Sequence, residues 1–233
     1  MLFNKNLGQN FLYDKSFLNK IEKLIDITGK NIIEVGPGSG QLTSVLLKKK
    51  PKTLTLIEKD YRFITELKEK YNVILDDCLT SNLNSDLVIS NLPYNISNDF
   101  LLKMYFEEFS DECYLMLQQE FAEKLISNNK MSYIGVLTNF VFDPKILLTI
   151  PPKAFFPKPK VFSNFVYFKK HNRFDFSNKN KQKMLDILKI LFKNSNKKIQ
   201  NLLKNEDLKY INNKYLDNRS NSLDLKDFFK LFV

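Results

Sequence analysis

Apolar runs alternate with amphipathic stretches along the first half of the chain. The short apolar runs predict buried strands at residues 31–35, 53–57, 73–75, 87–90 and 114–117. Apolar residues spaced three and four apart predict helices at 16–25, 41–48, 60–71, 98–106 and 120–127. Strands that alternate with helices in this way imply an α/β fold built on a mostly parallel sheet with both faces covered.

The pattern changes after residue 133. Residues 134–142 are mostly apolar, which fits a helix or a strand, and we favour a helix. Strands are predicted at 146–150 and 161–168, on either side of a proline-rich stretch. Helical periodicity returns at 184–192 and 223–232, with Asn/Lys-rich segments between them. We therefore place a boundary within 169–178, which gives a first domain at 1–170 and a small helical domain at 171–233.

The net charge of +10 is concentrated in the second of these domains. Residues 169–233 carry 16 Lys and Arg against 7 Asp and Glu, whereas the rest of the chain is nearly neutral. A basic helical domain suits a polyanion such as RNA, because phosphate contacts release counterions. A lysine-rich helical surface without a partner would have the same composition, so charge alone leaves both interpretations open.

The chain lacks residues that several classes of protein require. No apolar run approaches the roughly 20 residues that cross a bilayer, and the first ten residues do not resemble a signal peptide, so we expect a cytoplasmic protein with no membrane partner. Cys78 and Cys113 are isolated and His171 is the only histidine. Neither a zinc site nor a Ser-His-Asp mechanism is therefore expected, and we predict no metal.

A glycine-rich string, Glu34-Val35-Gly36-Pro37-Gly38-Ser39-Gly40, follows the first predicted strand. Glycines there let a ligand approach the backbone closely. Position 41, where a dinucleotide fingerprint has its third glycine, is Gln41, which disfavours a pyrophosphate and favours S-adenosylmethionine. Glu58 ends the next strand and can accept the ribose hydroxyls. Asp77, after the third strand, can accept the adenine amino group, although a turn cap explains it nearly as well.

A second string, Asn91-Leu92-Pro93-Tyr94, follows the fourth strand. An adenine amine is a poor nucleophile because its lone pair is delocalised into the ring. The Asn91 side-chain oxygen and the Leu92 carbonyl can each accept one of its N–H groups, Pro93 stiffens the loop, and Tyr94 offers a face for stacking. Taken alone, the string also fits an ordinary turn. Phe155 can close over the other face of the base, although a core position suits it better on sequence alone.

These motifs together resemble the ribosomal RNA adenine N6,N6-dimethyltransferases, in particular the small-subunit branch. The resemblance extends over residues 8–161 and is carried, in order, by Gly8-Gln9-Asn10-Phe11-Leu12, Glu34-Val35-Gly36-Pro37-Gly38, Glu58, Asp77, Asn91-Leu92-Pro93-Tyr94-Asn95-Ile96-Ser97 and Ala154-Phe155-Phe156-Pro157-Lys158-Pro159-Lys160-Val161. It implies a Rossmann-like class I methyltransferase with a mostly parallel seven-stranded sheet and a small all-helical C-terminal domain. It also implies dimethylation of two adjacent adenosines near the 3′ end of 16S rRNA, with the small ribosomal subunit as partner.

The resemblance further implies a set of site residues and a simple assembly. Cofactor contacts are implied for Asn10, Leu12, Gly36, Glu58, Asp77 and Asn91. Contacts with the target base are implied for Asn91, Leu92, Pro93 and Tyr94, with Phe155 nearby. A monomer is the simplest expectation. The chain departs from the family at Asn194-Ser195-Asn196-Lys197-Lys198, where arginines are usual, and at Ser132-Tyr133-Ile134, where Gly-x-Leu is common.

Three other functions remain open from the sequence. The first is the related 23S rRNA adenine N6-methyltransferase of the macrolide-resistance type. The second is a DNA or protein-glutamine N-methyltransferase with a similar tetrapeptide. The third is a small-subunit assembly factor that acts mainly by binding RNA.

Overall fold

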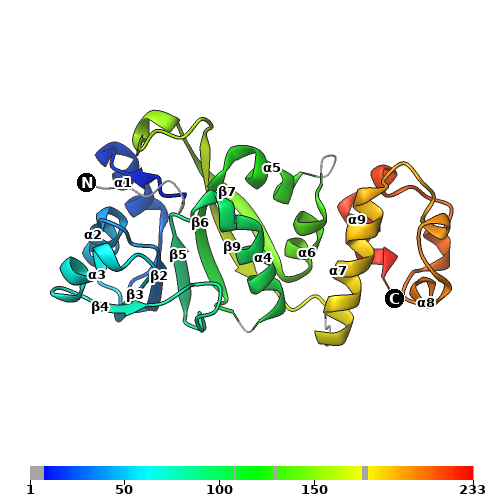
Figure 1. Ribbon diagram of the computed structural model, residues 1–233, viewed down its shortest axis with the longest axis horizontal. Coiled ribbons are helices and arrows are strands. Elements are labelled where there is room, and N and C mark those ends of the chain that lie inside the picture. Colours follow the sequence, from blue (N-terminus) through cyan, green and yellow to red (C-terminus); the bar gives the residue numbers. More distant parts are fainter. Residues whose placement is uncertain (1–7, 108, 128–130, 175–177, 233) are drawn as a thin grey trace. The chain divides into compact units, whose positions relative to one another are not determined.

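The computed structural model describes residues 8–107, 109–127, 131–174 and 178–232 (Figure 1). The chain forms two compact units, each made of two segments. The first, here the sheet unit, comprises Met1–Ala122 and Asp143–His171. The second, here the helical unit, comprises Glu123–Phe142 and Asn172–Val233.

A seven-stranded sheet is the centre of the sheet unit. Its strand order is β4 (Asn72–Leu75), β3 (Thr53–Glu58), β2 (Asn31–Val35), β5 (Leu87–Ser90), β6 (Glu112–Gln118), β9 (Ser163–Lys170) and β7 (Phe142–Ile150). The strands from β4 to β6 are parallel to their neighbours, and β9 is antiparallel to β6. The predicted mostly parallel seven-stranded sheet is therefore confirmed. The strand order reverses direction between β2 and β5, where open α/β sheets place their ligands.

The helices of this unit begin where the sequence supplies a cap or a tight turn. They are α1 (Lys15–Leu24), α2 (Gln41–Lys48), α3 (Tyr61–Lys68) and α4 (Ser97–Phe106). The next helix, α5 (Gln119–Ile126), begins in the sheet unit, and its residues from Glu123 onward belong to the helical unit. Asp14 caps α1 and Asp60 caps α3, each by accepting a hydrogen bond from a backbone N–H of the first turn. A buried cluster joins α1 and α2 to β2, β5 and β6, and each fully buried aliphatic side chain in it stabilises the fold by about 1.5–3 kcal/mol.

A two-stranded antiparallel ribbon, which the sequence did not predict, lies outside the sheet. It pairs β1 (Phe11–Leu12) with β8 (Phe155–Phe156). Figure 1 shows the yellow-green β8 region beside the blue N-terminal segment. Leu12 and Phe155 face each other and are buried in the core of the unit, so Phe11 and Phe156 lie on the opposite face of the ribbon.

The helical unit contains α6 (Tyr133–Val141), α7 (Asn178–Lys193), α8 (Asn205–Leu208) and α9 (Leu225–Leu231). The predicted helix at 134–142 is therefore confirmed up to Val141, and Phe142 begins β7. The ring of Phe140 on α6 lies 4.9 Å from Phe174, 5.0 Å from Phe229 and 6.1 Å from Phe232, measured between centroids.

This aromatic cluster changes the predicted domain division. The units divide between residues 171 and 172, within the predicted boundary at 169–178. Residues 175–177 of that range are outside the described part of the chain. Residues Glu123–Phe142, however, were assigned by sequence to the first domain and belong to the helical unit. The physical reason is that α6 packs on α7 and α9.

Among the described residues, no helix combines the length and the apolar character that a bilayer crossing requires.

Candidate active site

A cavity of about 250 Å³ lies at the carboxyl ends of four parallel strands. The residues that line it follow β2, β3, β4 and β5 or come from the N-terminal segment: Gly8, Gln9, Asn10, Phe11, Val35, Gly36, Gly38, Ile57, Glu58, Lys59, Asp76, Asp77, Cys78, Leu79, Asn91, Leu92, Pro93, Tyr94, Asn95 and Ile96. Parallel strands bring these distant parts of the sequence to one edge of the sheet. The structure thus brings together eight of the ten residues predicted for the site.

The glycine loop forms one wall of the cavity. Gly36 has a φ of 65°, and its N–H donates to the Ile57 carbonyl at 2.9 Å. A Cβ built on Gly36 would meet no atom within 4 Å, so the missing side chain leaves space beside the cavity. A ligand can therefore approach this backbone closely, as the sequence predicts.

Glu58 is held rigidly at the end of β3. Its Oε2 accepts from the Gly38 N–H at 3.0 Å and its Oε1 accepts from the Asp60 N–H at 2.8 Å. Burial raises the pKa of Glu58, and these backbone hydrogen bonds oppose that rise. Because a carboxylate oxygen accepts more than one hydrogen bond, Glu58 keeps acceptor capacity for hydroxyl groups in the cavity.

Asp77 caps a turn and also lies at the cavity wall. Its Oδ1 accepts from the Leu79 N–H at 2.9 Å, which caps a turn, and the residue also lines the cavity. Its Oδ2 forms an ion pair with Lys59 at 2.5 Å. The Lys59 ammonium, followed by the Leu79 N–H, lowers the pKa of Asp77. Asp77 is therefore an ionised acceptor at this wall.

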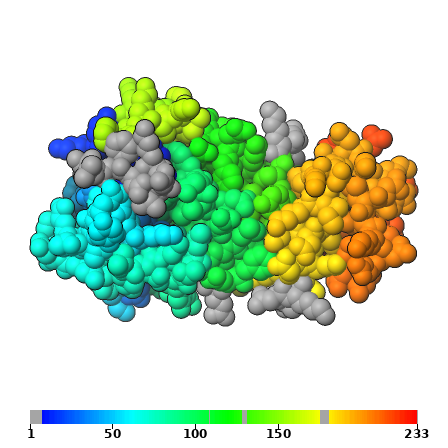
Figure 2. All heavy atoms as spheres, viewed as in Figure 1, coloured from blue at the N-terminus to red at the C-terminus, as the bar shows by residue number. Residues whose placement is uncertain are grey.

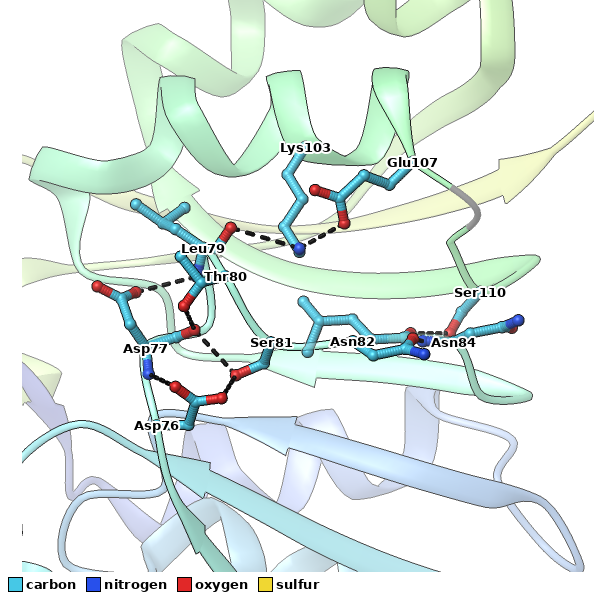
Figure 3. A network of polar contacts seen from close by, with 11 residues as sticks. Asp76, Asp77, Leu79, Thr80, Ser81, Asn82, Asn84, Lys103, Glu107 and Ser110 are labelled. Atoms are coloured by element: carbon cyan, nitrogen blue, oxygen red, sulfur yellow. Dashed lines mark hydrogen bonds and ion pairs between the residues drawn. The ribbon is translucent and has the colours of Figure 1, made fainter.

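A network of hydrogen bonds and ion pairs holds the turn at residues 76–81 (Figure 3). The Lys103 ammonium, on α4, donates to the Leu79 carbonyl at 3.4 Å and pairs with Glu107 at 2.5 Å. Ser81 donates to Asp76 Oδ2 at 2.7 Å. The Lys103 side chain is buried, so it fixes the turn from the interior of the unit.

Asn91 is anchored through its amide nitrogen. Its Nδ2 donates to the Asn10 carbonyl at 2.7 Å, and Asn10 Nδ2 donates to the Gly8 carbonyl at 3.1 Å. No residue in the described part of the chain donates to the Asn91 Oδ1 atom. The oxygen that the sequence assigns to the target amine is therefore available at the cavity wall.

Tyr94 is fixed at the other side of the tetrapeptide. It begins a short 3₁₀ helix, η2 (Tyr94–Ile96), and its hydroxyl lies 2.6 Å from Ser163 Oγ. Burial raises the pKa of Tyr94, so the phenol stays neutral at physiological pH. The ring is held by its hydroxyl and lines the cavity, as stacking on a base requires.

The N-terminal segment contributes two residues to which the sequence analysis gave no role. Gln9 donates to Asp60 at 2.8 Å, which ties this segment to the end of β3. The Phe11 ring lies directly over Gly38, where an added Cβ would meet ring carbons at 2.5 and 2.9 Å. Both residues belong to the string from Gly8 to Leu12 that carries the family resemblance, but a role was implied there only for Asn10 and Leu12.

Two predicted residues do not line the cavity. Leu12 was predicted to contact the cofactor, but it is 4 % exposed and packs in the core. Phe155 was predicted to close over the base, but it is 2 % exposed and faces Leu12 across the ribbon. Side chains alternate along a strand, so the partners that reach the outer face are Phe11 and Phe156.

We expect Gly38→Ala to weaken binding of S-adenosylmethionine by about tenfold or more. The added methyl group would collide with the Phe11 ring, and φ at Gly38 is +53°, where a side chain costs about 1–3 kcal/mol. Gly29→Ala is the matched control, since its φ is +72° but no atom lies within 4 Å of the added Cβ. Calorimetric titration of both variants measures whether the loss of affinity is specific to Gly38; equal affinities would contradict the role of Phe11.

The donor and acceptor groups fit S-adenosylmethionine. The glycine loop offers open backbone, Glu58 offers acceptors for ribose hydroxyls, and Asp77 offers an acceptor for an amino group. Among the described residues, no group of three or more His, Cys, Asp or Glu side chains is arranged to hold a metal ion.

Comparison with known proteins identifies the family of this chain. A family model described as ribosomal RNA adenine dimethylase matches residues 1–231. The chain belongs to the ribosomal RNA adenine dimethylase family. This membership confirms the predicted enzyme class, an S-adenosylmethionine-dependent rRNA adenine dimethyltransferase. A relative in Pelagibacter ubique, ribosomal RNA small subunit methyltransferase A, is 38% identical over 212 residues, covering 84% of this chain and 80% of its own.

Solved structures show the same fold in other dimethylases and methylases. A dimethyladenosine transferase from Plasmodium falciparum superposes with a TM-score of 0.79 at 24% identity, over 94% of this chain and 95% of its own. The 23S rRNA methyltransferase ErmE superposes with a TM-score of 0.68 at 22% identity, over 82% of each chain. Both confirm the class I methyltransferase fold of this dimethylase family member.

Proposed function

We propose that this protein dimethylates the N6 amines of two adjacent adenosines near the 3′ end of 16S rRNA, within the small ribosomal subunit. The observation that carries the proposal is the Asn91 side chain, whose nitrogen is held by Asn10 and whose oxygen remains available beside the glycine loop. The relative in Pelagibacter ubique is named for the small subunit, which supports that substrate.

We assign the target amine to two acceptors of the tetrapeptide. Asn91 Oδ1 and the Leu92 carbonyl each accept one N–H of the amine, which favours a pyramidal nitrogen with a localised lone pair. These hydrogen bonds strengthen as the nitrogen gains positive charge, so they stabilise the transition state more than the ground state. Tyr94 stacks on the base and Pro93 limits movement of the loop. No strong base is needed, since the alkylated nitrogen is acidic.

We assign the cofactor to the remaining wall of the cavity. S-adenosylmethionine supplies the methyl group when it is bound. Glu58 accepts its ribose hydroxyls, Asp77 its adenine amino group, and the Gly36 backbone lies against it. Asn10 shapes this pocket by holding Asn91 through its carbonyl. Lys59 keeps Asp77 ionised, which keeps the adenine acceptor in its stronger form.

We further propose that the protein acts as a monomer in the cytoplasm and that the helical unit contributes to RNA binding. The excess of Lys and Arg over residues 169–233 supports this role. Its exposed side chains include Lys193, Lys197 and Lys214.

The substrate is tested by locating transferred label. The protein is incubated with radiolabelled S-adenosylmethionine and, separately, immature small subunits, large subunits or DNA. We expect label on 16S rRNA, as N6,N6-dimethyladenosine at two adjacent positions. Label on large subunits alone would favour a 23S rRNA methyltransferase, the activity of ErmE, which has a similar fold. Binding to small subunits without label would instead favour an assembly factor.

A further inference from the structure

A loop with the sequence Phe-Pro-Lys-Pro-Lys-Val-Phe, residues Phe156–Phe162, connects β8 to β9 and exposes most of its side chains. Phe156 is 52 % exposed and Phe162 is 47 % exposed, unlike the buried aromatic residues around them. Lys158 and Lys160 are exposed between the two rings. Figure 2 shows the yellow-green spheres of this part of the chain at the molecular surface. We call this segment the 156–162 loop.

The first end of the 156–162 loop is fixed beside the cavity. Phe156 lies directly opposite Phe11 in the β1–β8 ribbon. Opposed residues of an antiparallel pair lie on the same face, with Cβ atoms about 4.5–5.5 Å apart. Phe11 lines the cavity and covers Gly38. The exposed Phe156 ring therefore neighbours a residue of the cavity wall.

The second end of the loop is fixed next to a partner of another cavity residue, Tyr94. The Phe162 carbonyl accepts from the Gln119 N–H at 2.9 Å, which holds the loop at the start of β9. The next residue, Ser163, is hydrogen-bonded to the hydroxyl of Tyr94, which lines the cavity beside Asn91. The loop therefore connects neighbours of two cavity-wall residues, Phe11 and Tyr94.

The chemistry of the loop suits a single-stranded nucleic acid. Two exposed aromatic rings flank two exposed lysines, and residues 144–174 contain seven Lys and Arg but no Asp or Glu. Aromatic rings stack on unpaired bases, and lysines neutralise the phosphates between them. An apolar protein surface would match the rings but would leave the two lysines without partners.

We propose that the 156–162 loop binds the single-stranded nucleotides that flank the target adenosine, with Phe156 stacked on the neighbouring base and Lys158 and Lys160 at the phosphates. The inference rests on the proposed function, since a target base that leaves its stack exposes one face of its neighbour. Where two adjacent adenosines are methylated in turn, that neighbour is the other adenosine. Phe156 thus positions one adenosine while the other occupies the cavity.

A double-mutant cycle, with one change in the protein and one in the RNA, tests whether Phe156 stacks on the neighbouring base. The RNAs are single-stranded oligonucleotides with two adjacent adenosines, with and without an abasic site in place of one of them. We expect Phe156→Ala to weaken binding of the intact RNA by roughly 5- to 150-fold. The abasic RNA should bind the wild type equally weakly, and Phe156→Ala should weaken that binding no further. Phe156→Tyr should restore affinity. The control Leu47→Ala, which shortens an exposed apolar side chain near the C-terminal end of α2, should leave affinity unchanged.

The lysines are tested by salt dependence. We expect Lys158→Ala/Lys160→Ala to reduce the slope of log affinity against log salt by about 1.4, the value for two phosphate contacts on a single strand. The control, Lys48→Ala/Lys52→Ala, removes the same charge from the opposite edge of the sheet, where α2 ends and β3 begins. An equal slope in both double variants would overturn the assignment of the lysines.

Methylation of small subunits separates failure of this inference from failure of the proposed function. A wild-type protein that adds no label to small subunits would refute the proposed function. If the wild type is active, the Phe156→Ala variant is compared with the control Leu47→Ala. Equal KM values for subunits and equal RNA affinities in these two variants would overturn only the inference. A variant that loses activity on subunits but binds the oligonucleotides like wild type would assign the loop to a ribosomal protein, which also overturns it.

Discussion

Asn91→Ala should lower the kcat of methyl transfer by about 10²- to 10³-fold, the loss typical of one preorganised group that acts on a developing charge. The variant loses the Oδ1 acceptor at the cavity and also the 2.7 Å hydrogen bond from Nδ2 to Asn10. The second loss affects the cofactor pocket, where one hydrogen bond contributes about 1 kcal/mol. Binding of S-adenosylmethionine should therefore weaken by only about fivefold.

Single-turnover methylation and calorimetric titration measure these two effects separately. Asn84→Ala is the matched control, because Asn84 is exposed and precedes β5 at the opposite edge of the sheet. Undiminished turnover, or an equal loss of binding and turnover, would refute the role assigned to Asn91.

Glu34→Gln should remove a large part of the pH dependence of stability. Glu34, on β2, is 1 % exposed, and its Oε2 has no hydrogen-bond partner in the described part of the chain. Burial raises its pKa from 4.5 to about 8. Between these values the unfolded chain has released the proton while the folded protein retains it. The free energy of unfolding therefore falls as pH rises, by about 3–5 kcal/mol in total for this group.

Urea denaturation at pH 5 and pH 8 measures this dependence. The glutamine variant has no proton to lose, so its stability should exceed that of the wild type most clearly at pH 8. Glu66→Gln, on the exposed face of α3, serves as control. Parallel curves for wild type and Glu34→Gln between these pH values would show that the folded protein does not retain this proton.

The sheet could be predicted because each of its strands carries a local signal. β2 and β5 are short apolar runs that end at turn-forming residues, and their predicted bounds agree with the structure. β6 and β9 extend beyond the predicted ranges at their polar ends, such as Glu112 and Lys170, because pairing rather than side-chain polarity sets where a strand ends. The ribbon of β1 and β8 has only two residues in each strand, which is too few for any periodicity.

The site could be predicted where its residues directly follow strands. Gly36, Glu58 and Asn91 meet at one edge because parallel strands end there. The contribution of Phe11 could not be predicted, since it depends on the path of the N-terminal segment over Gly38. For the same reason, the sequence could not predict which of Phe155 and Phe156 is buried. Which of two adjacent aromatic residues is buried is decided by the partner strand, and that partner is distant in the sequence.

The membership of α6 in the helical unit has a consequence for biosynthesis. A nascent chain that has been made as far as β9 contains every strand of the seven-stranded sheet but lacks Phe174, Phe229 and Phe232, whose rings pack on Phe140. Until translation supplies the last sixty residues, α6 offers an uncovered apolar surface to chaperones or to other chains. A protein truncated after residue 170 would keep that surface permanently, so we expect it to aggregate rather than to serve as an isolated catalytic domain.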